Sequence, residues 1–150
     1  MDSAISIRSA GEADFDTLTD VWERAARPTH PFLDDEHLAD LRPRIRDLLL
    51  PSMDVWLAAI DGRPVGFVGA RDDHVELLYI DPEAQGRGVG PALLTRVANG
   101  AGPRSVEVYA GNAVGLGFYR SQGFGETRRD PTDVVGRAFA IVHLERQEPT

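Results

Sequence analysis

Three glycines at alternate positions, Gly86, Gly88 and Gly90, form a loop of a kind that can hold a phosphate group. An apolar run precedes the loop and a run with helical spacing follows it, so we expect the loop to join a strand to a helix. The first turn of a helix presents unpaired backbone N–H groups, and glycines let an anion approach them closely. Arg87 adds a positive charge for the same anion. The pattern therefore predicts a phosphate-binding loop.

Two common nucleotide-binding loops do not fit this sequence. The Walker loop ends in Gly-Lys-Ser/Thr, and the chain contains no lysine. The dinucleotide fingerprint Gly-x-Gly-x-x-Gly needs a last glycine where the chain has Pro91 or Leu93. The chain also has no cysteine, which excludes a thiolate nucleophile, a disulfide and a Cys-based zinc site. A covalent acyl-cysteine step is therefore not expected.

Strand and helix patterns flank the loop on both sides. Before it we expect a strand at residues 5–8, a helix from Asp14 that ends at 28–31, and a second helix from about Asp35 that breaks at Pro43. Three strands of a meander should follow at 55–60, 65–70 and 74–80, with Asp61-Gly62 as a hairpin turn. These elements lead directly into the glycine loop.

After the loop we expect a helix whose apolar side chains Leu93, Leu94 and Val97 face inward. A strand at 105–109, a short helix from Asn112 through Tyr119, and strands at about 124–129 and 137–144 complete an α+β chain. We find no internal repeat and no linker. The 150 residues therefore read as a single domain, 1–150, that is long enough to bury one continuous core.

The loop and its flanks resemble the acetyl-CoA loop of the GCN5-related N-acetyltransferase (GNAT) family, Gln/Arg-x-x-Gly-x-Gly/Ala. Gln85, Gly88 and Gly90 fill its fixed positions, and the whole run 77–90 is similar to the central motif of the family. The order of the elements extends the resemblance to essentially the whole chain. It implies the GNAT fold, in which a mixed, mostly antiparallel central sheet carries helices on both faces.

A second GNAT motif, Asn-x-x-Ala-x-x-Phe-Tyr-x-x-x-Gly-Phe, is similar to residues 112–124. The chain departs from it at Gly115, which replaces the usual alanine. The stretch Thr-His-Pro-Phe-Leu at 29–33 also looks like that of small bacterial members. The resemblance implies transfer of an acetyl group from acetyl-CoA to a primary amine. Because the chain has no cysteine that could form an acyl-enzyme, we expect direct attack in a ternary complex.

The resemblance also implies which residues meet acetyl-CoA. Backbone groups of the strand before the loop would contact the pantetheine arm, and the loop backbone would hold the pyrophosphate. Asn112 either hydrogen-bonds to the arm or caps a turn. The residues expected around acetyl-CoA are Leu78, Tyr79, Ile80, Gln85, Gly86, Arg87, Gly88, Val89, Gly90, Pro91 and Asn112.

Two residues are the candidates for proton transfer that the resemblance implies. Tyr119 would be the general acid that protonates the leaving thiolate of CoA; the alternative is a core aromatic. Glu76 would be the general base that deprotonates the attacking ammonium group; the alternatives are a water molecule, or a solvated glutamate without a role.

An aromatic and imidazole group on the first helix and its loop, Trp22, His30 and Phe32, is the candidate acceptor site. His30 titrates near neutral pH, so it acts as a base or acceptor ligand, or it simply packs beside Pro31. The other histidines show no metal-binding pattern, so no metal is expected.

The net charge of −8 argues against nucleic-acid binding, which needs a basic surface. No apolar run reaches the roughly 18–20 residues of a membrane span, and the N-terminal residues do not resemble a signal peptide, so we expect a cytoplasmic protein without a membrane partner. We expect a monomer or a homodimer. The acceptor, a small molecule or a peptide, and the length of the acyl chain stay open. The competing hypothesis is a non-catalytic acyl-CoA sensor or partner-binding module on the same fold.

Overall fold

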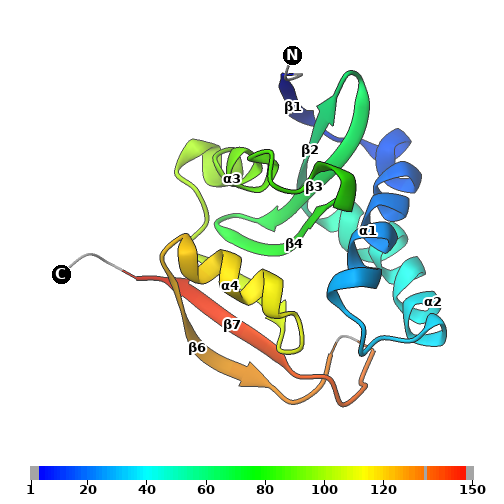
Figure 1. Ribbon diagram of the computed structural model, residues 1–150, viewed down its shortest axis with the longest axis vertical. Coiled ribbons are helices and arrows are strands. Elements are labelled where there is room, and N and C mark those ends of the chain that lie inside the picture. The colour runs from blue at the N-terminus through cyan, green and yellow to red at the C-terminus, as the bar shows by residue number, and fades with distance from the viewer. Residues whose placement is uncertain (1–3, 134, 148–150) are drawn as a thin grey trace.

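A seven-stranded mixed sheet organises the computed structural model, which describes residues 4–133 and 135–147 (Figure 1). The strands are β1 (Ile5–Ser9), β2 (Asp54–Ile60), β3 (Arg63–Arg71), β4 (His74–Ile80), β5 (Ser105–Tyr109), β6 (Phe124–Asp130) and β7 (Ile141–Arg146). Their order is β1-β2-β3-β4-β5-β7-β6, and every neighbouring pair is antiparallel except β4 and β5. The expectation of a mixed, mostly antiparallel sheet is confirmed.

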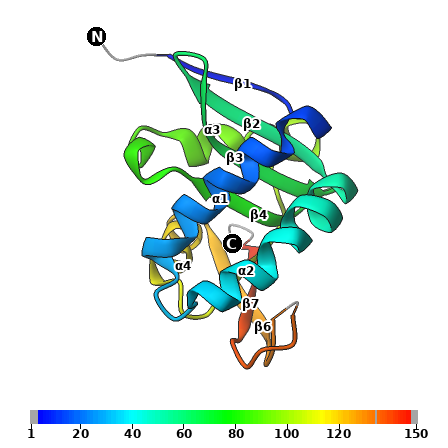
Figure 2. The ribbon, with the colours of Figure 1, turned by 90° about the vertical axis from the view of Figure 1, so that its right-hand side faces the viewer.

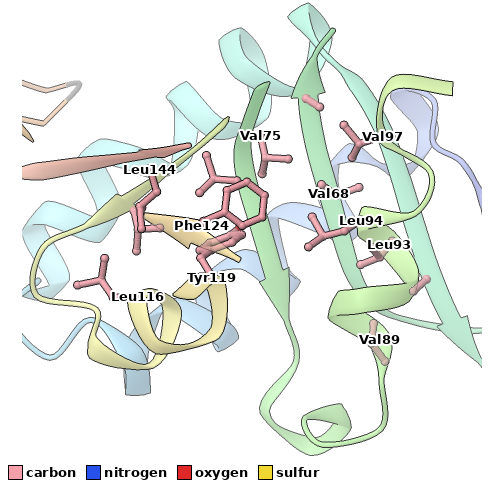
Figure 3. Packing of buried hydrophobic residues seen from close by; sticks show 14 of the residues in the cluster. Val68, Val75, Val89, Leu93, Leu94, Val97, Leu116, Tyr119, Phe124 and Leu144 are labelled. Atoms are coloured by element: carbon pink, nitrogen blue, oxygen red, sulfur yellow. The ribbon is translucent and has the colours of Figure 1, made fainter. Parts of the chain in front are cut away.

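Helices cover both faces of this sheet, as expected. The helices α1 (Phe15–Thr29) and α2 (Asp35–Arg44) lie together on one face (Figure 2). Residues of α1, α2 and the turns after α2 pack there against Leu57, Phe67 and Leu77. The other face carries α3 (Val89–Leu94) and α4 (Ala113–Ser121), whose apolar side chains pack against β3, β4, β5 and β7 (Figure 3). The sheet therefore separates two apolar cores.

The parallel pair β4–β5 is joined only at its first residues. His74 pairs with Ser105 and Val75 with Val106, and the pairing stops there. The register of β4 against β3 also shifts at this point, because Gly69 pairs with Leu77 and Ala70 with Val75, which leaves Glu76 as the extra residue of a bulge. A bulge bends its strand and increases the local twist. The strands consequently diverge beyond Val75, and Figure 1 shows the two parts of the sheet spreading apart there.

Several element boundaries differ from those expected from the sequence. The helix predicted after the glycine loop is only six residues long, and a separate 3-10 turn, Val97–Gly100, follows it, in which Ala98 and Asn99 adopt left-handed backbone conformations. The break predicted at Pro43 is a π-helical turn, Ile45–Leu49, that directly follows α2. The first helix ends at Thr29, within the predicted segment.

The last strand begins at Ile141, so the prediction of a strand from residue 137 was wrong. The carboxylate of Asp133 accepts hydrogen bonds from the backbone N–H groups of Val135 and Arg137, at 3.1 and 3.0 Å. These bonds fold the described residues between β6 and β7, 131–133 and 135–140, into a compact arrangement that we call the 131–140 connection. Backbone groups used in this way are not available to pair with a neighbouring strand.

Candidate active site

A cavity of about 860 Å³ opens where β4 and β5 diverge. Of the sixteen residues predicted from the sequence to form the site, the cavity is lined by Trp22, His30, Glu76, Leu78, Tyr79, Ile80, Gln85, Gly86, Gly88, Val89, Gly90, Pro91, Asn112 and Tyr119. Two predicted residues do not line it. Arg87 is exposed beside it, and Phe32 lies behind His30, with ring centroids 5.5 Å apart. The structure therefore gathers predicted residues from four separate segments, 22–30, 76–80, 85–91 and 112–119, around one space.

The loop at Gln85–Pro91, which we call the loop end of the cavity, is built from backbone. Gly86 and Gly88 have φ angles of +81° and +82°, which side chains other than glycine rarely adopt. A Cβ atom placed at either position would meet nothing within 4 Å, so open space lies beside the backbone. Within the described residues, the N–H groups of Gly86, Arg87 and Gly88 donate to no backbone carbonyl. Such a cradle fits a phosphate group.

Tyr119 reaches the cavity from the apolar core beneath α4. Its side chain is 4% exposed and packs against the ring of Phe124, with the two ring centroids 5.8 Å apart (Figure 3). The centroid of the Phe118 ring lies 5.2 Å from that of Tyr119. The hydroxyl makes no hydrogen bond within the part of the chain that the structure describes. Burial raises the pKa of the phenol, because an ionised oxygen would lose its hydration there. Tyr119 is therefore a core aromatic that also lines the cavity, with its phenol neutral.

Asn112 caps α4, which is the alternative that the sequence left open. Its side-chain oxygen accepts a hydrogen bond from the N–H of Gly115 at 2.9 Å. A Cβ atom at position 115 would lie 2.5 Å from the Asn112 amide nitrogen. The glycine that replaces the usual alanine of the motif thus leaves room for this cap.

Glu76 lies at the bulge of β4, on the wall of the cavity. Burial raises the pKa of its carboxyl group, and the positive charge of Arg71, 3.7 Å away, opposes that shift. A carboxylate with a raised pKa takes up a proton more readily than a fully solvated one. The position and environment suit a proton acceptor.

Glu107 on β5 is a cavity residue that the sequence interpretation missed. Oxygen atoms of Glu76 and Glu107 and a ring nitrogen of His74 lie within 4.8 Å of one another. Three such groups can bind a metal ion, but both nitrogens of His74 already have hydrogen-bond partners, Ser105 at 2.6 Å and Glu107 at 2.9 Å. We therefore interpret the group as a hydrogen-bonded cluster. The alternation of strand 105–109 could have identified Glu107, because it places Ser105, Glu107 and Tyr109 on one face.

Aromatic side chains form the opposite part of the cavity, which we call the aromatic end: Trp22, His30, Tyr79 and Tyr109. His30 is 2% exposed, and burial lowers its pKa to about 4, so its ring is neutral at pH 7. Its Nδ1 lies 3.1 Å from the carbonyl oxygen of Ala26. Because a carbonyl oxygen only accepts, Nδ1 carries the proton and Nε2 keeps its lone pair.

A buried polar contact holds the aromatic end together. The Asp133 carboxylate accepts hydrogen bonds from the Tyr109 hydroxyl at 2.8 Å and from Nε2 of His37 at 2.6 Å. The side chains of His37 and Asp133 are both 0% exposed. The contact joins α2, β5 and the 131–140 connection, which are far apart in the sequence. Neither His37 nor Asp133 was among the predicted site residues.

The sequence as a whole matches an established family. A model of the acetyltransferase (GNAT) domain fits residues 51–126. The chain belongs to the GNAT acetyltransferase family. This GNAT chain is 31% identical over 141 residues to the peptidyl-lysine N-acetyltransferase YjaB of Salmonella typhimurium, across 93% of this chain and 97% of that protein.

Solved structures agree with this GNAT assignment. The solution structure of the apo form of YjaB from Escherichia coli has a TM-score of 0.84 and 32% identity, and the match covers 95% of this chain and 97% of that one. The structure of yncA from Salmonella typhimurium with its cofactor acetyl-CoA has a TM-score of 0.62 and 26% identity, over 96% and 94% of the two chains. The predicted GNAT fold is confirmed.

Relatives that match nearly the whole GNAT chain carry N-acetyltransferase names. The chain is therefore an N-acetyltransferase, which favours an enzyme over the alternative of a non-catalytic sensor or partner-binding module. Among the described residues, no helix is both long enough and apolar enough to cross a membrane.

Proposed function

We propose that this enzyme transfers an acetyl group from acetyl-CoA to the side-chain amine of a lysine residue in a peptide or protein. The observation that carries the proposal is the cavity at the β4–β5 split, because it joins a backbone phosphate cradle to a wall of carboxylates and aromatic rings. The name of the YjaB relatives supplies the acceptor class, peptidyl-lysine.

The loop end fits acetyl-CoA. The N–H groups of Gly86 to Gly90 would bind the pyrophosphate, and Arg87, exposed beside the cradle, would add its charge. The backbone of Leu78, Tyr79 and Ile80, which has no partner on β5, would pair with the pantetheine arm. Bound acetyl-CoA supplies the acetyl group as an activated thioester.

The protein's own residues would manage two protons. Glu76 accepts a proton from the acceptor ammonium group at its carboxylate, directly or through water, and so frees the amine lone pair for attack. Tyr119 holds a proton on its hydroxyl oxygen at neutral pH and would give it to the departing thiolate. Both side chains line the same cavity, so the two transfers can serve one reaction.

The charges around the cavity favour a cationic acceptor. Among the described lining residues, the acidic and strongly basic side chains are three carboxylates, Glu76, Glu107 and Asp130, and one guanidinium, Arg71. The neutral rings of Trp22, Tyr79 and Tyr109 lie beside them at the aromatic end. An apolar stem that ends in an ammonium group, such as the lysine side chain, complements both surfaces.

The test is acetylation of an N-terminally blocked peptide that contains one lysine, followed by thiol release and by peptide mass. The control peptide carries norleucine in place of lysine and so lacks only the amine. Because the enzyme contains no lysine, its own side-chain amines cannot contribute to the signal. We expect thiol release and a mass increase of one acetyl group with the lysyl peptide only. Binding of acetyl-CoA without acetylation of any lysyl peptide would overturn the proposal.

A further inference from the structure

Glu107 faces Glu76 across the split between β4 and β5, and both side chains line the cavity. The two carboxylates and the His74 ring lie within 4.8 Å of one another. An ammonium group between two carboxylates at this spacing can donate a hydrogen bond to each of them. The proposed mechanism gives a role to only one of these two carboxylates, Glu76, so the presence of Glu107 needs a separate explanation.

A chain of hydrogen bonds holds Glu107 in place. Nε2 of His74 lies 2.9 Å from Oε1 of Glu107, and Nδ1 of His74 lies 2.6 Å from Oγ of Ser105. A carboxylate oxygen only accepts, so Nε2 carries the proton in this contact. The hydrogen bond to Glu107 raises the pKa of His74, which shows that the positive imidazolium and the negative carboxylate stabilise each other. Contacts on both ring nitrogens fix the orientation of His74, and His74 fixes that of Glu107.

The two carboxylates differ in their surroundings. Burial raises the pKa of Glu76, and its nearest cation, Arg71, lies 3.7 Å away without a hydrogen bond. Glu107 has a hydrogen-bonded imidazole, and a second histidine, His143, lies 3.9 Å from the same oxygen. His143 in turn is hydrogen-bonded to Asp130 at 2.6 Å. Unequal surroundings give two neighbouring acids different tasks.

We infer that Glu107 is the residue that binds the ammonium group of the acceptor, and that His74 is the residue that positions it. In this division Glu76 removes the proton, whereas Glu107 holds the amine beside the split. The inference rests on the proposed function, because it assumes that the acceptor is a cationic amine. It assigns binding of the acceptor to Glu107 and deprotonation to Glu76.

The experiment compares KM and kcat for the lysyl peptide in three variants. Glu107→Gln should raise the KM for the peptide by about 10- to 100-fold, the range for a lost charge-assisted hydrogen bond, while kcat stays within about threefold. Glu76→Gln should instead lower kcat with a smaller change in KM. The matched control is Glu145→Gln, which removes the same charge from an exposed position on neighbouring β7, outside the cavity, and should leave both constants unchanged.

A double-mutant cycle tests the positioning role of His74. His74→Leu, which removes the hydrogen bond, should raise the KM for the peptide by about fivefold, and His74→Gln, which keeps a donor, by less. In the Glu107→Gln background, His74→Leu should have no further effect on KM, because it acts only through Glu107. A merely structural histidine would give the same loss in both backgrounds, which would overturn the positioning role.

Two kinetic results would overturn the role of Glu107. One is a lower kcat with unchanged KM in Glu107→Gln, which would make it the base; the other is a response no larger than that of Glu145→Gln. If the wild-type enzyme acetylates no lysyl peptide, the proposed function fails, and the role of Glu107 needs a test that does not depend on activity.

That test is calorimetric titration of the lysyl and norleucyl peptides into the CoA-saturated enzyme. A wild-type preference for the lysyl peptide that Glu107→Gln abolishes supports the inference, and equal binding of both peptides overturns it.

Discussion

The two ends of the cavity are built in different ways. The loop end comes from one continuous stretch, Gln85–Pro91, and presents mainly backbone N–H groups. The aromatic end comes from α1, β4 and β5, is held by α2 and the 131–140 connection, and presents side chains. A diphosphate is the same in every molecule of acetyl-CoA, so backbone groups suffice to bind it. An acceptor differs from enzyme to enzyme, and side chains are the means by which a common fold changes what it binds.

The first prediction changes only the loop end of the cavity, and its effect on acetyl-CoA affinity is the largest that we expect. Gly88→Glu should weaken acetyl-CoA binding about a thousandfold, because it strains a left-handed residue and places a negative charge in the phosphate cradle. Gly88→Ala adds the strain without the charge and should weaken binding about tenfold. Calorimetric titration with acetyl-CoA measures both. Equal affinities for the wild type and Gly88→Glu would show that the phosphates bind elsewhere.

The second prediction changes only the aromatic end of the cavity and concerns the stability of the protein. Asp133→Asn should lower the free energy of unfolding by about 3 kcal/mol, because it removes a buried carboxylate and presents an amide nitrogen to the donors of Tyr109 and His37, which need an acceptor. Affinity for acetyl-CoA should be kept. The control Asp40→Asn removes a carboxylate that binds Arg137 of the same connection at the surface, and it should change stability little. Urea unfolding compares them, and equal losses would contradict the role given to the buried pair.

This contrast also explains what the sequence could predict. The glycine loop, Tyr119 and the sheet class follow from local patterns and from two motifs that each lie within one stretch of chain. Asp133 carries no such pattern, since its partners His37 and Tyr109 are 96 and 24 residues away. Glu107 is a partial case, because alternation along its strand gives the face on which it lies but not its neighbour. Glu107 lies close to Glu76 only because β5 is the neighbour of β4 in the sheet. The loop and α3 separate these two strands in the sequence, so no local pattern predicts that they are neighbours.

The third prediction compares the removal of one tyrosine hydroxyl at two positions of the cavity, Tyr119 and Tyr109. Tyr119→Phe should lower kcat about a hundredfold through loss of the general acid. It should leave stability nearly unchanged, since this hydroxyl has no hydrogen bond among the described residues. Tyr109→Phe removes the hydrogen bond to Asp133 and should lower the free energy of unfolding by about 1 kcal/mol, with a much smaller effect on kcat. Steady-state kinetics and urea unfolding measure the pair. If kcat falls equally in both, Tyr119 is not the specific acid.

The last prediction concerns the pH dependence of stability and tests the aromatic end separately from the rest of the molecule. His30 has a pKa of about 4 in the folded protein and about 6.5 when unfolded. Between these values the unfolded chain binds a proton that the folded chain does not, so stability should fall as the pH falls, by about 2 kcal/mol from pH 7 to pH 5. His74, whose pKa is raised, acts in the opposite direction: its contribution to stability is present at low pH and is lost as the pH rises through its folded pKa.

Comparing urea unfolding of the wild type and His30→Gln at both pH values isolates the contribution of His30, because every other titratable group is shared by the two proteins. The variant should lose about 2 kcal/mol less than the wild type over this range, and equal losses would mean that the His30 ring is hydrated rather than buried.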